Sequence, residues 1–87
     1  MPVTHQVLIE RSAAKSLAQI TSPHRERITE AIRALANNPR PPGAKKLSGR
    51  DAWRIRVGTY RVIYEISDKE LRILVVVVGP RQDVYRK

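Results

Sequence analysis

Cysteine and phenylalanine are absent from the 87-residue chain, and its aromatic residues are one tryptophan and three tyrosines. Without cysteine, neither a disulfide framework nor a cysteine-based metal site is possible, which favours a cytoplasmic protein. The only two histidines, His5 and His24, stand apart from any carboxylate cluster, so we expect no metal site. With so few aromatic residues, stacking platforms for single-stranded nucleic acid are scarce.

Long hydrophobic runs are missing too. The longest, Ile73–Val78, is far shorter than the about 20 residues that cross a bilayer. The N-terminal residues lack the basic and then apolar pattern of a signal peptide. We therefore expect neither a membrane span nor a secretory signal.

Acidic residues are outnumbered by basic ones, and the excess is uneven. The net charge is +9 and the calculated pI is about 10.9. Residues 1–39 carry five Lys/Arg and three Asp/Glu, whereas residues 40–87 carry twelve and five. A basic C-terminal half implies a polyanionic partner, either nucleic acid or an acidic protein, and charge alone does not choose between them.

The length predicts one domain, residues 1–87, with a sheet covered on one side by helices. We expect a short strand at Val3–Ile9, then a helix capped by Ser12, then a helix with Ser22 as N-cap and Pro23 in its first turn. The brief break between the helices predicts an antiparallel pair lying on the sheet. The apolar stripes are Ala13, Leu17 and Ile20 in the first helix and Ile28, Ala31, Ile32 and Leu35 in the second.

Residues 53–66 are typical of a β-hairpin. Apolar and polar residues alternate on both sides of Gly58-Thr59, and glycine suits the first central position of a type II′ turn, where φ is positive. This turn places Arg56 opposite Arg61, with Arg54 on the same face. Like charges directly opposite each other destabilise a sheet, so an anion held between them would explain the arrangement. The alternative is a solvated basic face.

A third strand is expected after a turn at residues 67–70. Pairing Ile66 with Leu71 puts Glu65 opposite Arg72, an opposite-charge pair that favours this register. Apolar residues on both faces predict an interior strand. The register predicts Leu71, Ile73, Val75 and Val77 on the helix-covered face and Arg72, Leu74, Val76 and Val78 on the other.

The same register places Val76 opposite Arg61, so the chain beyond Gly79-Pro80 is expected beside the hairpin arginines. Arg81, Asp83 and Tyr85 follow at alternate positions. We expect three arginines, an acid and a tyrosine to converge at one corner of the uncovered face. The connection at residues 40–50 adds Lys45 and Lys46, which either contact a phosphate backbone or belong to a solvated loop.

The predicted fold is α+β: an N-terminal strand, a two-helix hairpin and an antiparallel meander, in one mainly antiparallel sheet with the helices on one face. This order resembles the RelE/ParE superfamily of bacterial and archaeal toxins, as do residues 53–58, 60–64 and 78–86. The likeness covers essentially the whole chain, and the hairpin and tail motifs resemble the RelE branch rather than the ParE branch.

The resemblance implies the toxin of a type II toxin–antitoxin system, a cytoplasmic, metal-independent endoribonuclease without a cofactor. Such toxins cut mRNA in the decoding site of the 70S ribosome, and a small acidic antitoxin neutralises them. The residues that we expect to be catalytic are Arg54, Arg56, Arg61, Arg81 and Tyr85. Those that we expect to contact RNA are Arg54, Arg56, Lys45, Lys46 and Asp83. We expect the antitoxin to cover an apolar strip made by Ile63, Leu74, Val76 and Val78.

The expected chemistry is attack of the 2′-hydroxyl on the scissile phosphate, held by Arg56 and Arg61. Guanidinium groups offer fixed bidentate donors to phosphate but are poor general bases, because they stay protonated. Some relatives have lysine at the positions of Arg54 and Arg56, and many have histidine where this chain has Pro80. The remaining candidates for acid and base are Asp83, Tyr85 and Glu65, with Arg81 as a further proton donor or electrostatic stabiliser.

Two other functions stay open. The chain could be a non-nucleolytic inhibitor of DNA gyrase, as the ParE branch resembles, which needs no arginine cluster centred on a phosphate. It could also be an RNA- or ribosome-binding module, or a catalytically decayed toxin, in which the arginines only dock.

Overall fold

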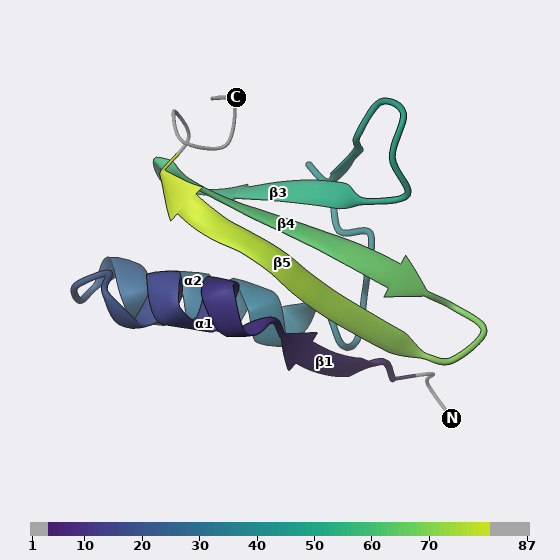
Figure 1. The fold of residues 1–87 in the computed structure, drawn as a ribbon, viewed down its shortest axis with the longest axis horizontal. Helices are drawn as coiled ribbons and strands as arrows, with labels where there is room; N and C mark the ends of the chain where they lie inside the picture. Colours follow the sequence, from purple (N-terminus) through teal and green to yellow (C-terminus); the bar gives the residue numbers. More distant parts are fainter. Residues whose placement is uncertain (1–3, 81–87) are drawn as a thin grey trace.

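Residues 4–80, the part of the chain that the computed structural model describes, form a five-stranded sheet with two helices on one face (Figure 1). The elements in chain order are β1 (Gln6–Ile9), α1 (Arg11–Ala18), α2 (His24–Ala34), β2 (Lys45–Lys46), β3 (Trp53–Val57), β4 (Tyr60–Ser67) and β5 (Arg72–Pro80). The strand order is β1-β5-β4-β3-β2, and only the β1–β5 pair is parallel. The predicted α+β fold is therefore confirmed, with β5 as the expected interior strand.

The core lies between the helices and the sheet. α1 packs against β5, whereas α2 packs against β3 and β4. Both predicted apolar stripes contribute to it. Its buried members are Ala13, Ile20, Ile28, Ile32, Leu35, Ile55, Val62, Tyr64, Ile73, Val75 and Val78. In the described part of the chain, neither helix is long and apolar enough to cross a membrane.

Neither serine caps its helix as predicted. α1 begins after Glu10, and the Ser12 hydroxyl donates a hydrogen bond to the Glu10 carboxylate at 3.1 Å instead of serving as the N-cap. α2 begins at His24, one residue later than expected, and the Ser22 hydroxyl donates to the Glu26 carboxylate at 2.7 Å. That bond lowers the pKa of Glu26. In both places the serine hydroxyl donates to a nearby carboxylate, and within residues 4–80 no side chain accepts a hydrogen bond from the backbone N–H groups at the helix start.

The hairpin of β3 and β4 has the predicted turn and register. Gly58 has a φ of +61°, while Thr59 is not among the residues with positive φ, which is the combination that a type II′ turn requires. Arg56 pairs with Arg61, and Arg54 pairs with Ile63. The hydrophobic alternation and the glycine thus specify this part of the sheet together.

The predicted register between β4 and β5 is wrong. Arg72 lies opposite Ser67 and Leu74 lies opposite Glu65, so the pair expected between Glu65 and Arg72 does not form. Leu71, with a φ of +55°, belongs to the turn rather than to the strand. A shift of two residues keeps the same side chains on the same face, so the apolar alternation cannot detect it.

A β-bulge then changes the faces of β5. Tyr64 pairs with Val75, whereas Ile63 pairs with Val77, so the strand carries one extra residue between these pairs. Beyond the bulge Val78 lies opposite Val62 and joins the core under the helices. Val78 was expected on the uncovered face, and the bulge is the reason that this expectation is wrong.

The segment between α2 and β3 is fastened to the sheet. The buried Tyr64 hydroxyl donates a hydrogen bond to the Pro39 carbonyl at 2.7 Å, and burial raises the pKa of Tyr64 to about 12. Arg40 donates to Asp68 at 2.8 Å and lies 5.2 Å from the ring centroid of the half-buried Trp53. These contacts hold the start of the segment that contains β2, which we expected to be a loop from the sequence.

We predict that Tyr64→Phe lowers the free energy of unfolding by about 1 kcal/mol, because it removes the bond to the Pro39 carbonyl. Urea denaturation followed by circular dichroism measures the change. Tyr60→Phe is the matched control, since Tyr60 is half-buried on the same strand and makes no hydrogen bond through its hydroxyl among residues 4–80. Equal losses in the two variants would contradict the role given to this bond.

Candidate nucleic-acid interface

Four basic side chains occupy one face of three adjacent strands. Lys45 of β2 lies directly opposite Arg54 of β3, and Arg56 of β3 lies directly opposite Arg61 of β4. Side chains of directly paired residues share a face, and residues two apart on one strand share it as well. The sheet therefore places two like-charged pairs next to each other, on the face away from the helices.

Burial divides these four side chains into two kinds. Arg61 is 1% exposed and Arg54 is 6% exposed, whereas Arg56 and Lys45 are exposed to solvent. A fully solvated basic face, the alternative left open by the sequence, therefore does not describe Arg54 and Arg61. Burial of a charged group is costly unless other groups hold it, so the inner arginines have defined positions and the outer two groups reach the solvent.

A cleft of about 310 Å³ opens beside β2 and β3. The residues that line it are Pro42, Gly43, Lys45, Arg54, Ile55 and Arg56, and none of the lining residues from the described chain is acidic. Its outer wall is a tight turn, because the Ala44 N–H donates to the Pro41 carbonyl at 2.9 Å. Gly43 has a φ of +92°, which suits the third position of a type II turn with proline before it. The sequence Pro-Gly before Lys45 was the available signal for this turn.

The remaining predicted site residues of the tail, Arg81, Asp83 and Tyr85, lie outside the described residues. Their convergence with the hairpin arginines stays a prediction. β5 does extend through Gly79 and Pro80, which pair with Arg61 and Tyr60. The described chain thus ends at the corner of the sheet that carries the Arg56–Arg61 pair, although by a register different from the predicted one.

Two other candidates lie away from this cluster. Lys46 pairs with Trp53, and the alternation along β2 sends its side chain to the face opposite that of Lys45. Glu65 is four residues from Arg61 on β4, roughly 13 Å along the strand. That separation is too large for Glu65 to exchange a proton with a group held at Arg61, so it is no longer a candidate acid or base.

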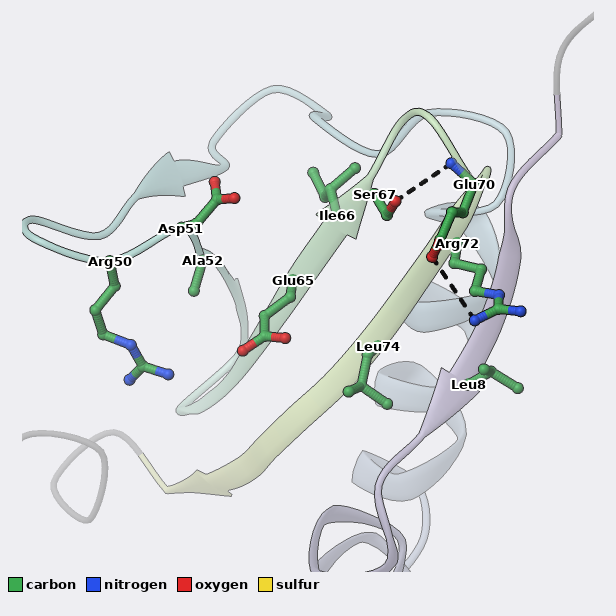
Figure 2. Close-up of a pocket in the computed structure, with 10 residues that line it drawn as sticks. All are labelled: Leu8, Arg50, Asp51, Ala52, Glu65, Ile66, Ser67, Glu70, Arg72 and Leu74. Carbon is green, nitrogen blue, oxygen red and sulfur yellow. Dashed lines mark hydrogen bonds and ion pairs between the residues drawn. The ribbon is translucent and has the colours of Figure 1, made fainter.

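Glu65 instead lines a second cleft, of about 430 Å³, at the far corner of the uncovered face (Figure 2). Charges of both signs surround an apolar floor there. The lining residues are Leu8, Arg50, Asp51, Ala52, Glu65, Ile66, Ser67, Glu70, Arg72 and Leu74. Arg72 lies 3.7 Å from the Glu70 carboxylate, an exposed ion pair that Figure 2 marks. We call this site the Leu8–Leu74 cleft.

The apolar strip expected on this face is smaller than predicted. Val78 belongs to the core, and Ile63 is 5% exposed. Leu74 and Val76 are half-buried, and Leu8 of the neighbouring strand, opposite Leu74, is 42% exposed. Leu8 and Leu74 therefore keep apolar surface exposed at the Leu8–Leu74 cleft, while Ile9 and Leu71 are the other exposed large apolar residues among residues 4–80. Within residues 4–80, no three His, Cys, Asp or Glu side chains are grouped so that they could hold a metal ion.

Comparison with known proteins gives consistent matches across the chain. The model of one family, described as the ParE toxin of the type II toxin–antitoxin system parDE, matches residues 7–85. An Escherichia coli protein described as RelE-like is 29% identical over 85 residues, which cover 93% of this chain and 90% of that protein.

Solved structures with the same fold are also similar in sequence. A chain of the archaeal RelE–RelB complex from Pyrococcus horikoshii OT3 is 30% identical, with a TM-score of 0.77 over 90% of this chain and 96% of that chain. The isolated RelE toxin of Escherichia coli is 26% identical, with a TM-score of 0.77 over 93% of this chain and 90% of its own.

We predict that Arg56→Glu raises the free energy of unfolding by about 0.2–1 kcal/mol, because it replaces a like-charge pair with Arg61 by an opposite-charge pair. Urea denaturation at low and high salt measures the gain, which should shrink as salt screens the charges. Lys46→Glu makes the same charge change opposite the uncharged Trp53 and serves as the control. If the free energy of unfolding rises no more than in Lys46→Glu, repulsion between Arg56 and Arg61 does not destabilise the protein.

Proposed function

The chain belongs to the ParE toxin family of type II toxin–antitoxin systems, within the RelE/ParE superfamily, and we propose that it acts as a ribosome-dependent mRNA endoribonuclease. The observation that supports this activity is the direct opposition of Arg56 and Arg61. Like charges in direct opposition weaken the sheet, and a phosphodiester that bridges the two guanidinium groups would offset their repulsion. The decoding site of the 70S ribosome would supply the mRNA, which places the action in the cytoplasm.

In the proposed reaction the 2′-oxygen of one nucleotide attacks the adjacent phosphorus. A bond forms from the 2′-oxygen to phosphorus, the bond to the 5′-oxygen breaks, and the products are a 2′,3′-cyclic phosphate and a 5′-hydroxyl end. Arg56 and Arg61 stabilise the extra negative charge on the phosphate oxygens, and Arg54 contacts the backbone beside them. The proton taken from the 2′-hydroxyl and the one given to the 5′-oxygen are assigned to the tail residues Asp83, Tyr85 and Arg81.

The burial of Arg61 adds a condition to this proposal. A side chain that is 1% exposed reaches a phosphate only after its surroundings open. Arg56 is exposed and lies directly across from it, so we propose that the phosphate meets Arg56 first and Arg61 second. Tightening of catalytic contacts in the substrate complex is common among enzymes.

We also propose a small acidic antitoxin as the partner. The Pyrococcus horikoshii relative was solved as a RelE–RelB complex. On this chain, carboxylates of such a partner would pair with the exposed basic residues, and its apolar side chains would cover Leu8 and Leu74. The antitoxin would then bind the same face as the RNA and block it.

Gyrase inhibition is the second candidate, because the matching family model is named for ParE. Gyrase inhibition needs no cleavage of RNA, and it would not explain why Arg56 lies directly opposite Arg61. Parallel assays of DNA supercoiling and of translation with the purified protein discriminate between the two. A docking module, or a toxin whose activity has decayed because Pro80 replaces a histidine, would bind ribosomes without producing cut ends.

We predict that Arg61→Ala and Arg81→Ala each lower mRNA cleavage on purified ribosomes by at least about tenfold. Mapping of mRNA ends in the decoding site, with detection of a 2′,3′-cyclic phosphate, measures the reaction. Because Arg61 is buried, Arg61→Lys is a second variant that keeps the charge and most of the volume but loses the bidentate fork. Circular dichroism verifies the fold of each variant. Cleavage at the wild-type rate in all three would refute the assignment.

We predict that co-expression with the neighbouring gene of its operon yields a stable complex with a small acidic protein. Leu74→Asp should weaken this complex, because it places a charge on the apolar floor of the Leu8–Leu74 cleft. Lys69→Asp, on the exposed turn before β5, is the control for an added acidic residue. Recovery of the protein alone, or equal binding by both variants, would argue against this partner and this surface.

A further inference from the structure

We propose that the cleft between β2 and the turn at Pro42-Gly43 holds a second RNA phosphate, beside the scissile one, and that Lys45 is its principal ligand. This inference rests on the proposed function and specifies how that site binds its substrate. The sequence predicts both Lys45 and Lys46 as RNA contacts. The sheet separates them, since Lys45 faces the arginines and Lys46 does not.

The two like-charged pairs form a row that crosses three strands, so it is long enough to follow more than one phosphate. Neighbouring strands are about 4.8 Å apart, so the backbones of β2 and β4 are separated by roughly 10 Å. Arg61 is on β4 and Lys45 is on β2, with Arg54 and Arg56 on the strand between them. RNA carries one negative charge on every nucleotide, so consecutive phosphates can follow this row from Arg61 and Arg56 to Arg54 and Lys45.

The cleft is built before any ligand arrives. Proline fixes φ at the second position of the turn, Gly43 takes the positive φ of the third, and the Ala44–Pro41 hydrogen bond closes it. The chain enters β2 directly after this turn, at Lys45. The position of the lysine backbone is therefore fixed by turn geometry and strand pairing, even though β2 has only two residues.

Charge in the cleft favours a polyanion. Neither Lys45 nor Arg56 forms an ion pair with any acidic residue among residues 4–80. The described lining also contains no acidic residue, so both side chains can turn toward an incoming anion. Lysine suits this task, because its ammonium group binds phosphate as a point charge from several directions.

An acidic protein segment is the other ligand class that such charges attract. A protein segment gains most of its binding energy by burying apolar side chains, and only Pro42 offers an apolar side chain here, because that of Ile55 is buried in the core on the other face. The Leu8–Leu74 cleft provides that contact at the opposite corner. The geometry therefore favours nucleic acid at Lys45.

The test measures binding of the full-length protein to a short single-stranded RNA that carries 2′-O-methyl groups and so cannot be cut by its own hydroxyls. Fluorescence anisotropy gives the Kd over a series of salt concentrations. We expect Lys45→Ala to raise the Kd several-fold at low salt and to reduce the slope of log K against log salt by about 0.7, the contribution of one phosphate contact with a single strand.

Two variants make the comparison specific. Lys69→Ala removes the same charge on the turn before β5 and corrects for the net charge of the protein. Lys46→Ala removes it from the neighbouring residue on the opposite face of β2. The proposal is overturned if Lys45→Ala behaves like Lys69→Ala, or if Lys46→Ala weakens binding as much as Lys45→Ala. It is also overturned if the wild-type protein fails to bind the RNA, or if Lys45→Ala weakens only binding of an acidic partner protein.

The outcome is separable from that of the proposed function, which is judged by cleavage on ribosomes. If ribosomal mRNA stays intact with the wild-type protein and Lys45→Ala still weakens RNA binding, the nuclease assignment fails and the phosphate position at Lys45 stands. If mRNA is cut and Lys45→Ala binds RNA like Lys69→Ala, the nuclease assignment stands and the phosphate position fails.

Discussion

Direct opposition of like charges across neighbouring strands is the constraint around which this face of the sheet is built. Arg56 faces Arg61, and Lys45 faces Arg54, so each pair sets like charges directly opposite each other, an arrangement that by itself opposes strand association. The strands pair nonetheless, because Ile55, Val62 and Tyr64 on the other face are buried beneath the helices. Burial of these apolar side chains therefore offsets the repulsion between strands on the charged face. Because the apolar face stabilises the sheet, this small domain tolerates a concentrated positive charge on the other face.

The segment between α2 and β3 extends the basic face by one short strand, β2. β2 has two residues, too few to pair stably on its own. It is held because Tyr64 anchors the Pro39 carbonyl from within the core and because a Pro-Gly turn fixes the chain just before Lys45. Lys45 is thereby placed by contacts that involve the core and the turn rather than its own side chain.

Local patterns in the sequence predict the strand register correctly where only one register satisfies them. The hairpin around Gly58 combines alternation with a residue that permits positive φ, and its register and facing arginines were predictable. The β4–β5 register was not, because a shift of two residues preserves the alternation and because nothing local marks the bulge beside Tyr64. The same bulge moved Val78 into the core. Burial of Arg54 and Arg61 depends on tertiary packing and has no sequence signal.

The uncovered face has two corners of different chemistry, and this has a consequence for inhibition. The corner at Arg56 and Lys45 has basic side chains and little apolar surface, whereas the Leu8–Leu74 cleft has apolar surface with charges of both signs. A ligand that is only anionic fits the first corner, and a folding peptide gains apolar burial at the second. A partner chain long enough to reach both could bind tightly through the apolar corner while its carboxylates occupy the basic one. Such a partner would block RNA at the basic corner. Most of its own affinity would come from the apolar corner, which RNA does not use.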